Sequence, residues 1–231
     1  DTARMAFALS RVAGAAALAG ALAFAGCSST PSTPFVDPDV PAVSVNPDGL
    51  AYPTDHIGTR ARSKVRAGDR LANFAFQGYL DGNPQGTLKT LAMADLYDPD
   101  AKRSRLLHIQ GVAGWCPVCA SEAKQTLAAA SALRAEGAVI IQVLMQGAKR
   151  SVGPSLADLE TWCDTYETKH AVLLDVDGRR LSVFGIDGFP WNALIDTRTM
   201  EILDQGIGAP RDVAAYVREG LRLANAPPAT Y

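Results

Sequence analysis

From about residue 57 onward, short apolar runs alternate with longer stretches in which apolar and polar residues are mixed. The short runs predict strands over residues 74–80, 106–112, 139–145, 172–174, 193–196 and 201–204. The mixed stretches predict helices over residues 91–96, 117–136, 155–169 and 211–225, with a helical turn over 180–184. The run 139–145 is a long apolar one, as in a central parallel strand. This order, with the last two strands as an antiparallel pair, predicts an α/β domain with a mixed central sheet flanked by helices.

Local signals mark where several of these elements begin or end. Turns are predicted at 81–83 and 177–178, where Asp, Gly and Asn gather. Ser155 and Asp158 form a capping pattern at the start of one helix, and Pro210 is expected to open the last one.

The chain divides by composition into four parts. Residues 27–56 are rich in Pro, Ser, Thr and Asp, which predicts an extended linker, and residues 57–226 have the length of one domain. Residues 227–231 form a short tail, and residues 1–26 have the pattern of a signal peptide.

Arg4 and Arg11 precede the apolar run 12–26, which is short for a bilayer span and ends at Phe24-Ala25-Gly26-Cys27. Small residues before a cysteine resemble the lipobox of bacterial lipoproteins, although Phe24 stands where Leu is usual. The resemblance implies that Cys27 is acylated and anchors the protein to a membrane of the bacterial cell envelope. The alternative is an ordinary secretory signal with a chance cysteine. Because Ser28 rather than Asp follows, retention at the inner membrane is not signalled.

Composition narrows the function classes. The formal net charge is −2, and no basic cluster suggests a nucleic-acid partner. An exported chain meets an oxidising compartment, where disulfide chemistry is expected of the three cysteines that follow Cys27.

The pentapeptide Trp115-Cys116-Pro117-Val118-Cys119 lies where a predicted strand meets a predicted helix. Unpaired N–H groups and the helix dipole at this position favour thiolate over thiol. A thiolate there is a nucleophile toward another disulfide. The alternative is half of a zinc site, but the remaining cysteine and the three histidines have no paired ligand spacing.

Beyond this motif, the region after the linker resembles thioredoxin-fold proteins of the TlpA/ResA-like type, within the redoxin group. The residues that carry the resemblance follow one another along nearly all of that region: Gly68-Asp69, Asn73-Phe74, Asp81-Gly82, Trp115 to Glu122, Leu174-Asp175, Gly178, Gly188-Phe189-Pro190 and Leu194-Ile195-Asp196. The resemblance implies a thioredoxin-like sheet and a thiol–disulfide oxidoreductase that acts on protein thiols and disulfides. It implies no cofactor or metal, and it implies an electron donor or acceptor in the membrane or periplasm.

The same resemblance implies roles for the cysteines and the proline. Cys116 would be the exposed attacking cysteine, Cys119 the buried resolving one, and Pro190 a cis-proline beside the disulfide. Without the resemblance, Pro190 reads equally as a trans-proline at a strand start.

Four further side chains are expected near the disulfide. Glu122 matches a glutamate proposed to assist proton transfer; its alternative role is a first-turn helix stabiliser. Trp115 is expected at the surface, with core packing as the alternative, and Phe189 and Trp191 are expected to contact the substrate. Trp191 replaces a smaller residue found in many relatives. Proline comes first in the dipeptide Pro117-Val118, whereas it comes second in thioredoxin and in many TlpA-like proteins. Since this dipeptide influences the redox potential, the sequence does not decide between a reductant and an oxidant.

Two other residues, His108 and Cys163, are expected to lie in the interior. His108 is interpreted as an interior histidine. Cys163 is interpreted as a buried inert thiol, with a third redox thiol as the alternative.

Three other functions compete with the oxidoreductase. A peroxiredoxin would need Thr at position 113, where the chain has Ala. A copper-delivery protein would need a wider cysteine spacing and a late histidine, and no histidine follows His170. A structural lipoprotein with a retained redox fold is the third.

Overall fold

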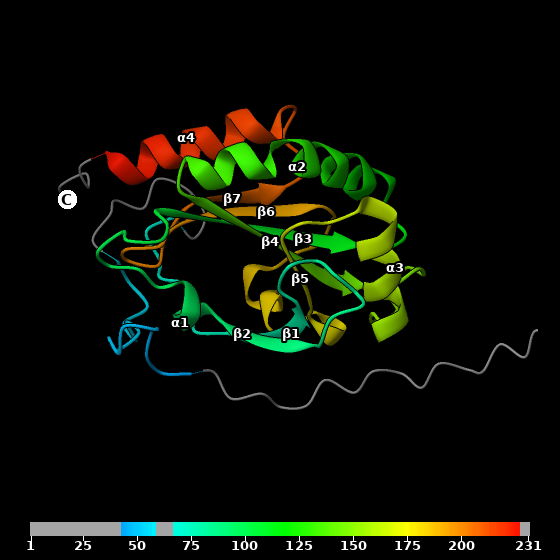
Figure 1. Cartoon of the computed structure of the whole chain (residues 1–231), viewed down its shortest axis with the longest axis horizontal. Helices are drawn as coiled ribbons and strands as arrows, with labels where there is room; N and C mark the ends of the chain where they lie inside the picture. Colours follow the sequence, from blue (N-terminus) through cyan, green and yellow to red (C-terminus); the bar gives the residue numbers. More distant parts are fainter. Residues whose placement is uncertain (1–42, 59–66, 227–231) are drawn as a thin grey trace, which may run out of the picture. The chain divides into compact units, whose positions relative to one another are not determined.

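The computed structural model describes residues 43–58 and 67–226, which form a mixed seven-stranded sheet with helices packed against it (Figure 1). The strand order is β2-β1-β5-β4-β3-β6-β7. The strands are β1 (Ala75–Tyr79), β2 (Lys89–Ala92), β3 (Leu106–Ala113), β4 (Ala138–Gln146), β5 (Ala171–Leu174), β6 (Trp191–Asp196) and β7 (Glu201–Ile207). The helices are α1 (Met93–Leu96), α2 (Pro117–Ala135), α3 (Leu156–Tyr166) and α4 (Val213–Asn225), with 3₁₀ turns η1 (Val176–Gly178) and η2 (Leu181–Phe184).

The centre of the sheet is parallel and its flanks are antiparallel. β4 pairs in parallel with β3 and β5, whereas β6 runs antiparallel to β3 and β7, and β1 antiparallel to β5 and β2. Every residue of β3 is buried, as expected for a strand covered on both faces. The predicted mixed sheet with a central parallel strand over 139–145 is confirmed.

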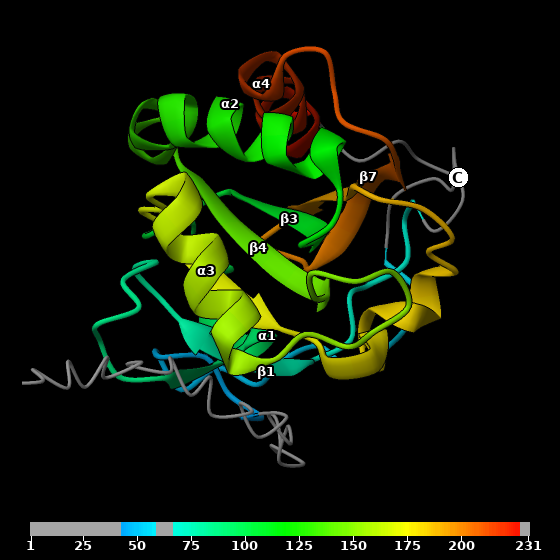
Figure 2. The same ribbon diagram turned by 90° about the vertical axis from the view of Figure 1, so that its right-hand side faces the viewer.

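Helices α2, α3 and α4 cover one face of the sheet, as the two views show (Figures 1 and 2). Successive side chains of a strand point to opposite faces. Leu106 and Val112 of β3 therefore join the core beneath these helices, whereas Leu107 and Ile109 join the core beneath α1 and η2. The face beneath α2 is the one next to Cys116 and Cys119, because α2 begins at these two cysteines.

Helix α3 begins as its capping pattern predicts. The Asp158 N–H donates to the Ser155 hydroxyl at 3.2 Å, and the Ser155 N–H donates to the Asp158 carboxylate at 2.8 Å. The helix ends at Tyr166 rather than at 169, because Glu167 adopts a left-handed backbone with φ of 46°.

Two other predicted boundaries are wrong. Residues 89–92 form β2, with Leu91 paired opposite Phe76 of β1, so the predicted helix 91–96 is reduced to α1. The last helix is opened by Asp212, whose carboxylate accepts from the Ala215 N–H at 3.0 Å, and not by Pro210.

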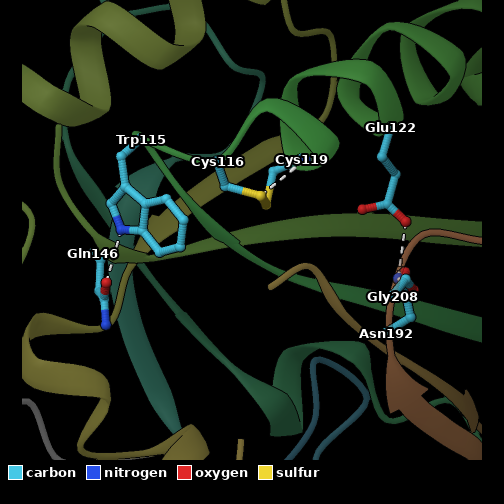
Figure 3. Close-up of a disulfide and its surroundings, with 7 residues drawn as sticks. All are labelled: Trp115, Cys116, Cys119, Glu122, Gln146, Asn192 and Gly208. Atoms are coloured by element: carbon cyan, nitrogen blue, oxygen red, sulfur yellow. Dashed lines mark hydrogen bonds between the residues drawn. A yellow bond between two sulfur atoms is a disulfide. The ribbon is translucent and has the colours of Figure 1, made fainter. Parts of the chain in front are cut away.

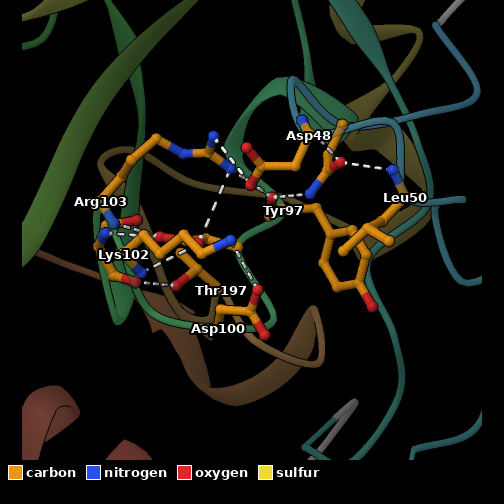
Figure 4. Close-up of polar contacts among 10 residues, drawn as sticks. Asp48, Leu50, Tyr97, Asp100, Lys102, Arg103 and Thr197 are labelled. Carbon is orange, nitrogen blue, oxygen red and sulfur yellow. Dashed lines mark hydrogen bonds and ion pairs between the residues drawn. The ribbon is translucent and has the colours of Figure 1, made fainter.

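Part of the expected 27–56 linker packs against the domain. The Tyr52 side chain is 6% exposed, and its hydroxyl donates to the Leu71 carbonyl at 2.6 Å. Asn46 donates to the Tyr97 carbonyl at 3.1 Å, and Asp48 pairs with Arg103 at 3.3 Å (Figure 4). The buried ring of Tyr52 and the buried amide of Asn46 thus anchor this segment to the domain. The predicted extended linker is therefore wrong for these residues. Cys27 and the predicted signal peptide lie outside the described residues.

Within the described ranges, no helix has the length and apolar character needed to cross a bilayer.

Candidate functional site

Cys116 and Cys119 form a disulfide at the junction of β3 and α2 (Figure 3). Cys116 is the N-cap residue of α2, and its Sγ accepts a hydrogen bond from the Cys119 N–H at 3.0 Å. Cys116 is 4% exposed and Cys119 is fully buried. Cys116 is therefore the more accessible of the two in the disulfide, but it is not the exposed cysteine that the resemblance implied. The strand–helix junction predicted for the motif is therefore correct, and the first sulfur lies among the free N–H groups of a helix N-terminus.

Neighbouring residues explain why the chain turns here. Pro117 occupies the first helical position, where a missing N–H does no harm. A Cβ on Gly114 would lie 2.9 Å from the Gly147 carbonyl oxygen, so only glycine lets this turn approach the end of β4 so closely.

Trp115 and Phe189 form an aromatic rim beside the disulfide. Their rings meet edge to face, with centroids 6.1 Å apart, and both side chains are half-buried. The Trp115 Nε1–H donates to Gln146 Oε1 at 2.8 Å, and the Arg150 guanidinium lies 4.1 Å above the indole ring. The indole is therefore held in one orientation while part of it faces solvent.

The Phe189–Pro190 peptide bond is cis, as the resemblance implied. Trp191, in contrast, does not line a groove. It is 1% exposed, stacks near Phe184 at 4.8 Å and donates to Gln205 Oε1 at 2.7 Å. The expected substrate contact of Trp191 is wrong in this structure, because alternation along β6 points its ring into the core.

A cavity of about 530 Å³ opens beside the rim. Its lining includes Gln146, Ser151, Ser182, Ile186, Asp187 and Phe189. Gln146 therefore both holds Trp115 and forms part of the cavity wall. The exposed Val118, 49% accessible, lies between the two cysteines in the sequence and adds apolar surface at the site.

Glu122 lies in the second turn of α2 and is fully buried. Its Oε1 accepts from Asn192 Nδ2 at 2.8 Å. Burial raises the pKa of Glu122 from 4.5 to about 7, although the amides of Asn192 and Gln110 favour the charged form and lower it in part. The alternative role as a first-turn stabiliser is wrong, because the first turn of α2 contains no acidic residue.

Three buried amides form a row beneath α2 that the sequence pattern did not predict. Gln110 of β3 lies in register with Gln142 of β4 on one side and with Asn192 of β6 on the other. Gln142 donates to Gln110 Oε1 at 3.0 Å, and Gln110 donates to Thr126 of α2 at 3.0 Å. Single polar residues inside otherwise apolar runs were the available signal, but their alignment depends on strand register.

The other residues singled out from the sequence are buried. His108 is fully buried, its Nε2 lies 2.7 Å from Asn192 Oδ1, and burial lowers its pKa to about 4. Cys163 is a free cysteine with 1% exposure, and burial raises its pKa to about 11. A group of three or more His, Cys, Asp or Glu side chains arranged to hold a metal ion does not occur among residues 43–58 and 67–226.

Comparison with solved structures identifies the fold. The chain is similar to a thiol:disulfide interchange protein DsbE from Chlorobium tepidum, with 19% identity, 70% of this chain and 99% of that chain covered, and a TM-score of 0.52. A second Chlorobium tepidum protein, a thiol:disulfide interchange protein of the thioredoxin family, matches with 19% identity, 71% and 100% coverage and a TM-score of 0.51. An uncharacterized conserved protein from Geobacillus kaustophilus matches with 14% identity, 72% and 86% coverage and a TM-score of 0.55.

Neither a protein-family profile nor a curated protein sequence matches the chain. The structural likenesses thus concern the architecture, at identities too low to carry an activity. They confirm the predicted fold class, and the chain has a thioredoxin-like fold.

Proposed function

We propose that this chain is a thiol–disulfide oxidoreductase that exchanges the Cys116–Cys119 disulfide with the thiols and disulfides of exported proteins. The observation that carries the proposal is the hydrogen bond from the Cys119 N–H to Cys116 Sγ at the start of α2. The names of the Chlorobium tepidum proteins of similar fold agree with this activity.

The chemistry begins from the reduced dithiol. The helix N-terminus and the Cys119 N–H stabilise negative charge on Cys116 Sγ, which lowers the cost of forming its thiolate. That thiolate attacks one sulfur of a substrate disulfide, forms a mixed disulfide, and releases the other substrate sulfur as a thiolate.

The second step closes the protein disulfide. Cys119 loses its proton, attacks Cys116 Sγ, and displaces the remaining substrate sulfur, so two electrons have passed from the protein to the substrate. Glu122 lies three residues further along the same helix and is also fully buried, and in this proposal it accepts that proton. The same steps in reverse oxidise a substrate dithiol.

The rim and the cavity favour a protein substrate over a small one. Trp115, Phe189 and Val118 offer partly exposed apolar surface around the sulfurs, and the adjacent cavity of about 530 Å³ has room for a substrate side chain. The electron donor or acceptor that completes the cycle is expected to be another dithiol or disulfide protein of the envelope.

The location is part of the proposal. The apolar segment 12–26, followed by Cys27, supports export and a lipid anchor in the bacterial cell envelope. The remaining chain would then act on partners outside the cytoplasm, where disulfides persist.

Insulin reduction with dithiothreitol as the electron source tests the activity. The wild-type protein is expected to accelerate precipitation of the reduced insulin chains, and Cys116→Ser is expected to abolish the acceleration. Cys163→Ala is the matched control, because that cysteine is a free, buried thiol in α3 and is not part of the disulfide. Equal rates with and without Cys116 would refute the proposal.

A further inference from the structure

Asn192 lies at the centre of the buried polar groups beneath α2. It is 3% exposed, and its strand β6 lies between β3 and β7, where it pairs with Gln110 and Gly206. Asn192 follows Pro190 by two positions, with only Trp191 between them, so the alternation of the extended chain puts the side chains of Pro190 and Asn192 on the same side. The side chain of Asn192 therefore points into the buried region beneath α2, the helix that begins at the disulfide.

The amide of Asn192 makes three hydrogen bonds. Its Nδ2 donates to Glu122 Oε1 at 2.8 Å and to the Gly208 carbonyl at 3.1 Å, and its Oδ1 lies 2.7 Å from His108 Nε2. A backbone carbonyl can only accept, so the nitrogen of the amide must face Gly208. The oxygen must then face His108, and the Nε2 of that imidazole carries the proton.

The hydrogen bond from Asn192 occupies one carboxylate oxygen of Glu122 and leaves the other oxygen able to accept a proton. In Figure 3 one carboxylate oxygen points toward Asn192 and the other toward the side of the disulfide. That second oxygen, Oε2, is buried and has no hydrogen-bond partner of normal geometry within the described part of the chain. Cys119 and Glu122 are three residues apart on α2 and both fully buried, so they share the inner face of the helix.

We infer that Asn192 is a positioning residue for the resolving step, holding Oε1 of Glu122 so that Oε2 faces the proton of Cys119. The inference rests on the proposed oxidoreductase function and assigns a specific residue to it. The Cys119 thiol gives its proton to the Glu122 carboxylate, the thiolate attacks Cys116 Sγ, and the substrate sulfur leaves as a thiolate. The proton on Glu122 then passes to that leaving thiolate or to solvent.

The titratable neighbours of Glu122 do not take over this role. His108 of β3 stays neutral near pH 7, because burial lowers its pKa to about 4. Tyr216 of α4 also stays neutral, because burial and the nearby Asp204 of β7 raise its pKa. Of Glu122, His108 and Tyr216, Glu122 is therefore the group whose pKa, about 7, lies near neutral pH.

The two thiol steps can be timed separately with dithiobis(nitrobenzoate). Reduced protein releases one thionitrobenzoate when Cys116 attacks the reagent, and a second when Cys119 resolves the mixed disulfide. Stopped-flow absorbance gives both rates as a function of pH. The full chain carries Cys27→Ser in this experiment, so that the thiol of Cys27 does not react with the reagent.

Asn192→Ala removes the donor to Glu122, and Asn46→Ala is the matched control. Both asparagines are 3% exposed, but Asn46 bonds to residues 48, 50 and 97 instead. Asn192→Leu removes the same hydrogen bonds while filling the space, which guards against effects of a cavity. Thermal melts establish that each variant is folded.

Losing a hydrogen bond to a carboxylate favours the protonated acid, so the pH profile of the second release should move upward by about one unit or more in both Asn192 variants. The first release and the Asn46→Ala profile should not move. In a Glu122→Gln background, where the carboxylate is already absent, Asn192→Ala should change the second rate less than twofold.

Folded Asn192 variants whose second-release profile coincides with that of the wild type would overturn the inference while leaving the oxidoreductase proposal intact. A profile shift that persists unchanged without the Glu122 carboxylate would also overturn it, because the effect would not act through Glu122. Absence of even the first release would instead count against the proposed function itself.

Discussion

Replacing Glu122 with glutamine should stabilise the oxidised protein at alkaline pH relative to its stability at acidic pH. Burial raises the pKa of this carboxyl in the folded state from 4.5 to about 7. Below pH 4.5 the carboxyl is neutral in both folded and unfolded chains, so it contributes no pH dependence. As the pH rises from 4.5 through 7, the unfolded chain ionises first, and the folded state is progressively penalised.

The magnitude follows from the two values. The difference between 7 and 4.5 is 2.5 units, and each unit corresponds to about 1.36 kcal/mol. The wild-type protein should therefore lose about 3 kcal/mol of unfolding free energy between pH 4 and pH 8 through this group alone. Glu122→Gln should not show this loss. The variant's amide also leaves a buried donor unpaired, which costs about 1–3 kcal/mol, but this cost is the same at every pH and cancels from the difference.

Urea unfolding of the disulfide-bonded proteins, followed by tryptophan fluorescence at several pH values, measures this quantity. The difference in unfolding free energy, variant minus wild type, should rise by about 3 kcal/mol across the range. Glu136→Gln is the control. Arg218 lowers the pKa of the Glu136 carboxyl, so this group should change the unfolding free energy with pH in the opposite direction. Because the carboxyl is exposed, solvent screening keeps that change small. A flat difference for Glu122→Gln would show that the carboxyl is hydrated or otherwise charged in the folded state, and the reasoning would fail.

Other outcomes follow from burial and position. Limiting iodoacetamide should label reduced Cys116 before Cys119, and Cys163 should stay unlabelled in the folded protein because burial raises its pKa to about 11; peptide mapping that finds Cys119 labelled first would reverse the roles. Phe189→Ala should slow insulin reduction about two- to tenfold and a small aromatic disulfide less, because the rim contacts the larger substrate; equal slowing would place its effect on the thiols. Cys27→Ala should move the protein from the membrane pellet to the soluble fraction, and retention in the pellet would indicate an uncleaved anchor.

Much of the architecture could be predicted because it is encoded locally. The apolar run over 139–145 and the capping pair at Ser155 and Asp158 each determine an element within a few residues. Leu91 was misassigned because the short strand β2 is defined by pairing with β1, a contact that no local pattern records. Tyr52 was misassigned for a similar reason, since its burial depends on distant partners such as Leu71 and Tyr97.

The candidate site also contains features that local sequence predicts and features that depend on distant contacts. The position of Cys116 and Cys119 at a strand–helix junction could be predicted from their flanking residues. The direction of Trp191 could not, because it depends on where β6 begins and therefore on which face each residue takes. The amide row could not be predicted either, because Gln110, Gln142 and Asn192 meet only through the registers of three strands.

The buried carboxyl connects stability and activity in one group. The burial that costs about 3 kcal/mol at alkaline pH is also what brings the pKa of Glu122 to about 7, close to the pH at which a proton acceptor works best. An exposed glutamate near pKa 4.5 would be ionised but a much weaker base. A buried glutamate without donors would stay protonated and accept nothing. The amides of Asn192 and Gln110 hold Glu122 between these limits, since they favour the charged form against burial. Removing either amide should therefore raise the pKa of Glu122 further. The variant should lose more unfolding free energy at alkaline pH than the wild type does, and Glu122 should accept the proton of Cys119 only at a higher pH.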